Sequence, residues 1–334
     1  MASAAVAVRP AVPRRAGLAA LACGAALAVA TADAAEPFSI RDQNPLTRGA
    51  YLPLPAASDA GPLQFAAGLQ WTNTVNVDNT PRERLVVDEE SVEVDLSLAG
   101  ARGAWHWRAM LPVINRSGGI LDGVIDDWHR LFGLPQGDRQ SRPGNSYLVS
   151  YQRSGGPAFS VPAGTALGDL ELAAGRELVA GRGGSLTAWF GLAAPTGRRA
   201  ALTGDGALDA AVWIAGDSRF APRWSVAGRA GVTRAGGDGL LPFQRSIRFG
   251  TATLGFDATA RLECLLQLDQ HSAIARGSAL VFLQDVMQLT FGGRYWLRSG
   301  ATFEAGVVED IAVNHSPDVS FHIGWRSKAG GERR

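Results

Sequence analysis

Apolar and polar residues alternate in many segments of about 9 to 12 residues, and this pattern restricts the fold of the chain most. In "SVEVDLSLAG" (91–100), "MQLTFGGRYWL" (287–297) and "PDVSFHIGWRS" (317–327), apolar side chains share one face and polar or charged ones share the other. A side-chain period of two defines a β-strand, and about 9–11 residues is the length that a tilted strand needs to cross a bilayer. The pattern therefore predicts an all-β protein with strands long enough for a membrane.

The turns and the tryptophans favour a membrane barrel over a soluble sandwich. Tight turns are predicted at 99–104, 180–184, 256–260 and 297–301, and longer connections rich in Gly, Pro and charge lie between them. Short turns at one rim and long loops at the other are typical of outer-membrane barrels. The tryptophans near short turns or the C-terminus, as in an interfacial girdle, are Trp105, Trp107, Trp224, Trp296 and Trp325. In a soluble sandwich the same alternation would place charges such as Glu263 and Arg229 between the two sheets, where burying a charge is unfavourable.

Twelve strands are predicted within residues 63–326, which we expect to form an antiparallel transmembrane β-barrel with both termini in the periplasm. They are expected at 63–76, 84–98, 103–116, 167–179, 184–194, 208–216, 223–234, 247–256, 259–271, 286–297, 300–312 and 318–326. If 146–153 and 158–163 also join the wall, the number becomes fourteen. We expect 117–166 to be one long, plug-like insertion, extracellular or luminal, and 327–334 to be a C-terminal tail.

The N-terminus has the three regions of a secretory signal peptide. Arg9, Arg14 and Arg15 precede an apolar run from 16 to 30, and Ala32 and Ala34 stand before the expected cleavage site. We therefore predict that 1–34 is removed and that 35–62 is a periplasmic segment in front of the barrel. The expected location is the outer membrane of a Gram-negative bacterium, where the partners are membrane lipid and, during biogenesis, the barrel assembly machinery.

Charge and cysteine usage exclude several classes of function. The chain has 32 basic and 31 acidic residues, so nothing directs it to nucleic acid. Only Cys264 remains after the signal peptide, which leaves no intrachain disulfide. Metal-spaced Cys and His residues and phosphate-binding motifs are missing from the sequence, so we predict no metal and no cofactor. Charged residues on the inner face would give a polar lumen of mixed sign: Arg229, Glu263, Asp269, Arg294, Glu304, His322 and Arg326.

"GVIDDWHRLFGLPQGDR" (123–139) is the exception to the strand pattern. Its apolar residues recur at helical spacing, and Pro135 cannot continue a helix. The predicted amphipathic helix could cover the barrel mouth, fill the lumen as a plug or rest in lipid headgroups. Its candidate plug or latch residues are Asp126, Asp127, Trp128, His129 and Arg130. Such charges also occur on the solvated face of any amphipathic helix, so we interpret the segment as structural first.

Several segments resemble one known family. "FSIRDQNPL", "LDGVIDDWHRLFGLPQGDR", "LGDLEL", "WFGLAAPTG" and "TGDGALDAAVWI" are similar to the proteobacterial family called domain of unknown function 3187, over about residues 37–325. The resemblance implies an outer-membrane β-barrel without an assigned activity, and it supplies no catalytic residues.

Three functions remain open from the sequence. The first is a narrow or gated passive channel for a small solute, because twelve strands enclose a narrow bore. The second is a lipid-modifying enzyme at the extracellular rim, with catalytic candidates His271, Ser272, His315 and Ser316. Adjacent strand residues point to opposite faces, so His271 would have to pair with Ser316, or His315 with Ser272. The third is a non-conducting surface scaffold. Whether the protein is an enzyme stays open from the sequence, and we favour the interpretations without catalysis.

Overall fold

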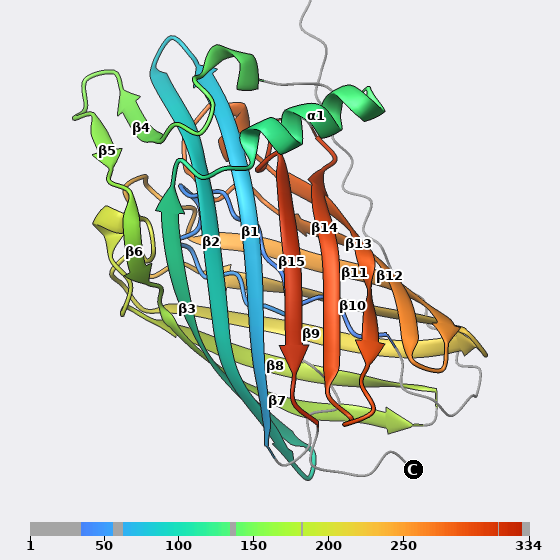
Figure 1. Cartoon of the computed structure of the whole chain (residues 1–334). Helices are drawn as coiled ribbons and strands as arrows, with labels where there is room; N and C mark the ends of the chain where they lie inside the picture. The colour runs from blue at the N-terminus through green and yellow to red at the C-terminus, as the bar shows by residue number, and fades with distance from the viewer. Residues whose placement is uncertain (1–34, 56–62, 134–137, 182, 313, 329–334) are drawn as a thin grey trace, which may run out of the picture.

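The computed structural model describes residues 35–55, 63–133, 138–181, 183–312 and 314–328, and forms a closed antiparallel β-barrel (Figure 1). The ring consists of β1 (Gln64–Asn79), β2 (Glu83–Arg102), β3 (Trp105–Ser117), β7 (Leu170–Gly181), β8 (Gly184–Ala194), β9 (Asp209–Ala221), β10 (Trp224–Arg234), β11 (Ser246–Thr259), β12 (Leu262–His271), β13 (Val286–Trp296), β14 (Thr302–Asp310) and β15 (Val319–Arg326). β1 pairs with β15 from Ala66↔Arg326 to Asn73↔Val319 and closes the ring. The twelve-stranded barrel predicted from the alternation is confirmed.

The alternation separates an apolar outer face from a polar inner face. In β12, Leu262, Cys264 and Leu266 are exposed, whereas Glu263 and Gln267 are buried. The buried face is the polar one, which is the inverse of a soluble β-protein. Only an apolar solvent outside the barrel makes this arrangement favourable.

The two rims differ as predicted. Five short connections join β2–β3, β7–β8, β9–β10, β11–β12 and β13–β14 at one rim, where β1 begins and β15 ends. The β9–β10 turn, at 221–224, was not among the expected tight turns. Exposed tryptophans lie close to this short-turn rim: Trp105, Trp107, Trp224 and Trp325. The other rim carries the long loops and one short connection, between β1 and β2 at 80–82.

Three short strands extend the wall at the long-loop rim: β4 (Leu148–Arg153), β5 (Phe159–Val161) and β6 (Gly164–Leu167). β4 pairs with β2 at Glu83–Asp88, beyond Glu90, where the β2–β3 pairing ends. β5 pairs with β4 alone. These strands therefore stand on the edge of the ring, and the alternative of fourteen wall strands is wrong.

The N-terminal segment, residues 35–55, lies inside the barrel (Figure 1, blue). Its side chains Phe38, Ile40 and Leu46 are buried, and the Phe38 amide donates to Gln267 Oε1 on the inner face of β12. The expectation that 35–62 is a periplasmic segment is therefore wrong for 35–55, and 56–62 lies outside the described residues. The contacts are long-range and leave no local pattern in the sequence.

The predicted helix exists as α1 (Asp122–Phe132), but it lies on the outer wall, near the long-loop rim (Figure 1). Gly133 ends it in the left-handed region, at φ 66°, and donates its N–H to the His129 carbonyl. Leu121 and Ile125 pack with Trp71 and Phe321, which stand opposite each other on the outward face of β1 and β15. Because Leu121 and Ile125 pack against the outside of the barrel, α1 is not a luminal plug.

Candidate functional site in the barrel lumen

The inner wall carries all seven of the charged residues expected to line the lumen. Glu263, Asp269, Arg294, Glu304, His322, Arg229 and Arg326 occupy inward positions of β10 and β12–β15. Their charges are largely paired with each other or with the N-terminal segment. Protein groups occupy the lumen near the short-turn rim, at mid-height and at the long-loop mouth.

Near the short-turn rim, Arg294 is the centre of an ion-pair cluster. Its guanidinium lies 2.8 Å from Glu304, 3.5 Å from Glu263 and 3.8 Å from Glu36 of the N-terminal segment. His322 Nε2 lies 2.9 Å from the other Glu304 oxygen, and Arg326 contacts Glu36. The cluster lies on the neighbouring strands β12–β15 and attaches the beginning of the segment to this side of the wall.

At mid-height the wall is acidic and the segment is basic. Glu93 and Asp95 of β2 and Glu171 of β7 face inward. Arg48 Nε donates to Glu93 Oε2 over 2.6 Å, and the Arg41 guanidinium pairs with Glu171. Sequence reasoning missed this site, although two arginines in "RDQNPLTR" on a chain with acidic inner strand positions were the available signal.

The backbone of the segment is held by side chains of the wall. The Tyr51 amide donates to Asp209 over 3.0 Å, and Thr233 Oγ1 donates to the Tyr51 carbonyl over 2.7 Å. The Arg41 amide donates to Gln70 Oε1 over 3.2 Å. Residues 35–55 belong to none of the barrel strands, so their release would break no strand pairing. Such hydrogen bonds are individually weak and can be replaced by water.

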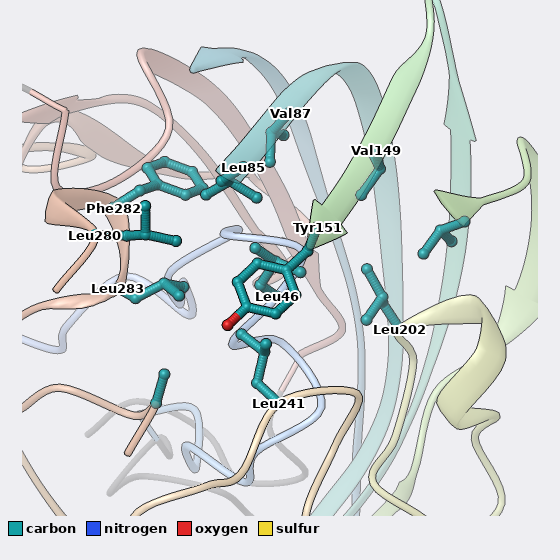
Figure 2. Packing of buried hydrophobic residues seen from close by; sticks show 12 residues of the cluster. Leu46, Leu85, Val87, Val149, Tyr151, Leu202, Leu241, Leu280, Phe282 and Leu283 are labelled. Atoms are coloured by element: carbon teal, nitrogen blue, oxygen red, sulfur yellow. The ribbon is translucent and has the colours of Figure 1, made fainter. Parts of the chain in front are cut away.

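The long-loop mouth is closed by apolar side chains that we call the mouth cap: Leu46, Leu202, Leu241, Leu280, Phe282 and Leu283. They converge from the segment and from three different loops, as Figure 2 shows. Asn44 Nδ2 donates to the Phe282 carbonyl over 2.7 Å and links the segment to the cap. The lumen is thus occupied along its length and covered at this mouth.

The His and Ser candidates do not meet as dyads. His271 Nε2 lies 3.2 Å from Asp42 of the segment, and its Nδ1 lies 2.9 Å from the Ser272 carbonyl. His315 Nδ1 lies 2.8 Å from the Asp285 carbonyl. Ser272 Oγ accepts the Arg248 amide, and Ser316 is buried. Among the described residues, no hydrogen bond joins either histidine to the hydroxyl of Ser272 or Ser316.

The expected latch residues lie outside the barrel with α1. Asp127 and Arg130 pair with each other on the exposed side of the helix, His129 is buried, and the Trp128 side chain lies outside what the structure describes. Asp126 joins Asp122 and Asp318 around Arg139, at 2.7, 3.0 and 3.0 Å. Asp126 thus pairs with Arg139, and Arg130 with Asp127, outside the barrel, and a role of Asp126 and Arg130 as latch charges against the wall stays a prediction.

One carboxyl of the Arg139 cluster has a shifted pKa. Burial raises the pKa of Asp318 to about 6, against the opposing effect of the Arg139 guanidinium. Arg139 Nη1 donates to Asn73 Oδ1 as well, on the outward face of β1. The cluster fastens the 118–147 region to β1 and to the loop before β15.

Two features are missing from the part of the chain that the structure describes. No helix there is long and apolar enough to span a bilayer. No group of three or more His, Cys, Asp or Glu side chains there is placed to hold a metal ion.

A closed barrel with an apolar outside, a polar inside and unequal rims defines the class of the protein as an outer-membrane β-barrel. The chain belongs to the family described as "Protein of unknown function (DUF3187)", whose model matches residues 16–329. The resemblance stated from the sequence is thereby confirmed. A search of curated proteins finds no match.

Solved structures with a similar fold are outer-membrane channels. An outer-membrane channel from Pseudomonas putida F1 aligns with a TM-score of 0.53 at 12% identity, over 84% of this chain and 97% of that one. The P. putida toluene transporter TodX aligns with a TM-score of 0.41 at 11% identity, over 83% of this chain and 92% of that one. The likeness of architecture rests on the first of these and concerns the fold alone.

Proposed function

We propose that this protein is a gated passive channel for a small solute, and that residues 35–55 are its gate. The observation that carries the proposal is the segment inside the lumen, held by ion pairs and side-chain hydrogen bonds rather than by strand pairing. The channel among the similar solved structures supports it. In this proposal the long-loop rim is extracellular and the short-turn rim is periplasmic, because outer-membrane barrels place their short turns in the periplasm.

The gate works through charge complementarity. Arg41 and Arg48 neutralise acidic positions of β2 and β7 while the segment is in place. When the segment leaves, Glu93, Asp95 and Glu171 face water, which solvates carboxylates well. Opening therefore exchanges protein partners for water and leaves the strand ladder intact. A polar lumen of mixed sign then admits a small hydrophilic or amphipathic solute.

The test is single-channel conductance of the refolded protein in planar bilayers. We expect the intact protein to be closed or to flicker, and a variant lacking 36–55 to conduct steadily. An Arg41→Gln, Arg48→Gln variant keeps the chain length and should open more often than the intact protein. Arg130→Gln, on the exposed side of α1, is the matched control and should behave as the intact protein does.

Two results would count against the gate. If intact protein and the double-arginine variant show the same open fraction, the arginines do not hold the segment. If neither variant conducts although both are folded by their circular dichroism, the lumen is sealed by its own wall and the scaffold alternative takes precedence. The enzyme alternative gains nothing from the structure, because its candidate histidines bond to other partners.

A further inference from the structure

Seven inward residues on seven neighbouring strands form a continuous row around half of the barrel. The strand registers connect them one to the next as His106↔Gly175, Gly175↔Trp189, Trp189↔Trp213, Trp213↔Gly231, Gly231↔Phe249 and Phe249↔His271. The Trp189 and Trp213 rings are parallel, with centroids 5.7 Å apart. His106 lies 5.9 Å from Trp189, and Phe249 lies 6.3 Å from Trp213. We call this set the aromatic row.

Glycines make the row possible. A Cβ atom on Gly175 would stand 2.6 Å from the Trp189 ring, and one on Gly231 would stand 2.7 Å from the Phe249 ring. Each large ring therefore leans over a glycine of the adjacent strand, where any side chain would displace it. The spacing of rings and glycines is built into the wall, so the row persists when the segment moves.

Two guanidiniums lie beside the row, and neither has a carboxylate within ion-pair distance among the described residues. Arg108 Nη1 donates to the Pro55 carbonyl over 2.7 Å, and Arg229 donates to the Pro53 carbonyl and to Thr251 Oγ1. The Arg229 guanidinium also lies 5.2 Å from the Phe249 ring. Main-chain carbonyls bring no negative charge, so neither guanidinium has a direct ionic partner there, and Glu171, Asp95 and Asp269 act on them only from beyond ion-pair distance.

The row also has an unused hydrogen-bond donor. Trp213 is buried, and its Nε1 has no hydrogen-bond partner among the described residues. A buried indole N–H normally finds an acceptor, because leaving this donor unpaired away from water is unfavourable. An oxygen atom of a bound molecule would satisfy it.

The N-terminal segment now occupies the positions that such a molecule would take. Tyr51 and Leu52 pack in the same cluster as Trp189, Trp213 and Phe249. The Pro55 carbonyl accepts a hydrogen bond from Arg108, and the Pro53 carbonyl accepts one from Arg229. In the closed state the Tyr51 ring therefore takes the place of a solute ring beside the row, and the two carbonyls take the place of solute oxygen atoms on the arginines.

Two hollows flank this part of the segment. Both are small and partly open to solvent; one is lined by Tyr51, Arg108, Glu171 and Trp213, and the other by Glu36, Trp189, Asp217 and Arg229. The acids are already engaged, since Glu171 pairs with Arg41, Glu36 with Arg326, and Asp217 accepts the Ser185 hydroxyl. Arg108 and Arg229, by contrast, are bound by carbonyl and hydroxyl oxygens rather than by carboxylates.

We propose that the aromatic row, with Arg108 and Arg229, is a binding site for a planar aromatic carboxylate that competes with residues 51–55. The inference rests on the proposed channel function and names its solute class. The solute ring stacks on Trp189 and Trp213, and its carboxylate pairs with a guanidinium, as charge-assisted pairs do. Binding displaces the Tyr51 side chain and the Pro53 and Pro55 carbonyls, so the solute favours the open gate.

Calorimetric titration of the refolded protein with benzoate tests this site directly. Benzyl alcohol keeps the ring and lacks the charge, and glucuronate keeps the charge and lacks the planar ring. We expect benzoate to bind at least about tenfold more tightly than either, a difference of about 1.4 kcal/mol. Tyr51→Ala, which removes the competing ring, should tighten benzoate binding further.

Arginine variants separate the two halves of the site. Arg108→Gln with Arg229→Gln should weaken benzoate about tenfold and leave benzyl alcohol unchanged. The matched control is Arg234→Gln, an exposed position on the same strand as Arg229. The proposal is overturned if benzoate fails to bind both the intact protein and Tyr51→Ala, or if glucuronate binds more tightly than benzoate.

Conductance separates this inference from the channel proposal. Steady conductance of the variant lacking 36–55, without benzoate binding, would leave the channel standing and remove the aromatic site. Benzoate binding without conductance in any variant would leave the site standing and remove the channel.

Discussion

At the scale of single residues, Asp318 gives the clearest dependence on pH. Its pKa, raised by burial to about 6, exceeds the value of about 3.9 that an aspartate has in an unfolded chain. Between these two values the folded protein binds more protons than the unfolded one, so stability rises as the pH falls. The Asp318 carboxylate therefore lowers stability at pH 7.5, and this cost shrinks as the pH falls from about 6 towards about 3.9.

We predict that Asp318→Asn stabilises the protein at pH 7.5 by about 1–3 kcal/mol, because a pKa raised from about 3.9 to about 6 corresponds to at most about 3 kcal/mol. The asparagine cannot carry the buried charge and still accepts the Val75 amide that Asp318 accepts. Urea unfolding in lipid vesicles at pH 7.5 and pH 5 measures the difference, which should shrink at pH 5. A loss of stability at pH 7.5 would show instead that the ion pair with Arg139 outweighs the burial of the charge.

At the scale of elements, α1 and the 118–147 region depend on Arg139. Its side chain is 2% exposed and faces Asp122, Asp126 and Asp318. Removing one partner of a buried ion pair leaves an uncompensated charge and costs about 3 kcal/mol or more. We predict that Arg139→Gln reduces the opening free energy of α1 by about that amount, and that hydrogen exchange of 122–132 accelerates.

Arg130→Gln is the control for this change. Arg130 pairs with Asp127 at two highly exposed positions of the same helix, and exposed pairs contribute little to stability. Hydrogen exchange of 122–132 should stay close to that of the intact protein. Equal acceleration in both variants would mean that the helix charge as a whole, rather than the cluster on the outer wall, holds the region.

The strands and the helix could be predicted because their signals are local. Alternation in "SVEVDLSLAG" reports which face is buried, and "DDWHRLFGLP" carries both helical spacing and a stop signal. The side of the wall on which α1 packs could not be predicted, because its apolar residues do not all lie on one face of the helix. Leu121 and Ile125 face the wall, whereas Ile120, Val124 and Leu131 are exposed.

The lumen was predicted only in part, for a reason of sequence distance. The inner charges follow from strand parity, but their partners do not. The hydrogen bond of Phe38 with Gln267 spans 229 positions, and that of Arg48 with Glu93 spans 45. The aromatic row needs the register of six strand pairs, and a slip of one residue in any of them would break it.

At the scale of the whole molecule, the barrel and its contents have different kinds of stability. The ring is closed by continuous strand pairing, which has no free edge and opens only with the whole fold. The segment and the mouth cap are held by side chains alone and can open separately. A rigid wall with a separately stable occupant is the arrangement that a gate requires.

The outer face carries a natural probe of the membrane. Cys264 is exposed between Leu262 and Leu266 on the apolar side of β12. In protein prepared without residues 1–34, whose one cysteine is Cys264, we predict that this thiol in lipid vesicles reacts with a lipid-soluble maleimide faster than with a charged one, because the charged reagent cannot enter the apolar band. Asp127→Cys with Cys264→Ser places a thiol on the exposed side of α1 and should react readily with the charged reagent. The opposite result would be that the charged maleimide labels Cys264 in vesicles as fast as it labels the thiol of the Asp127→Cys variant, and as fast as it labels the unfolded protein. In that case the outer face of β12 meets water, and the membrane-spanning orientation of the barrel is refuted.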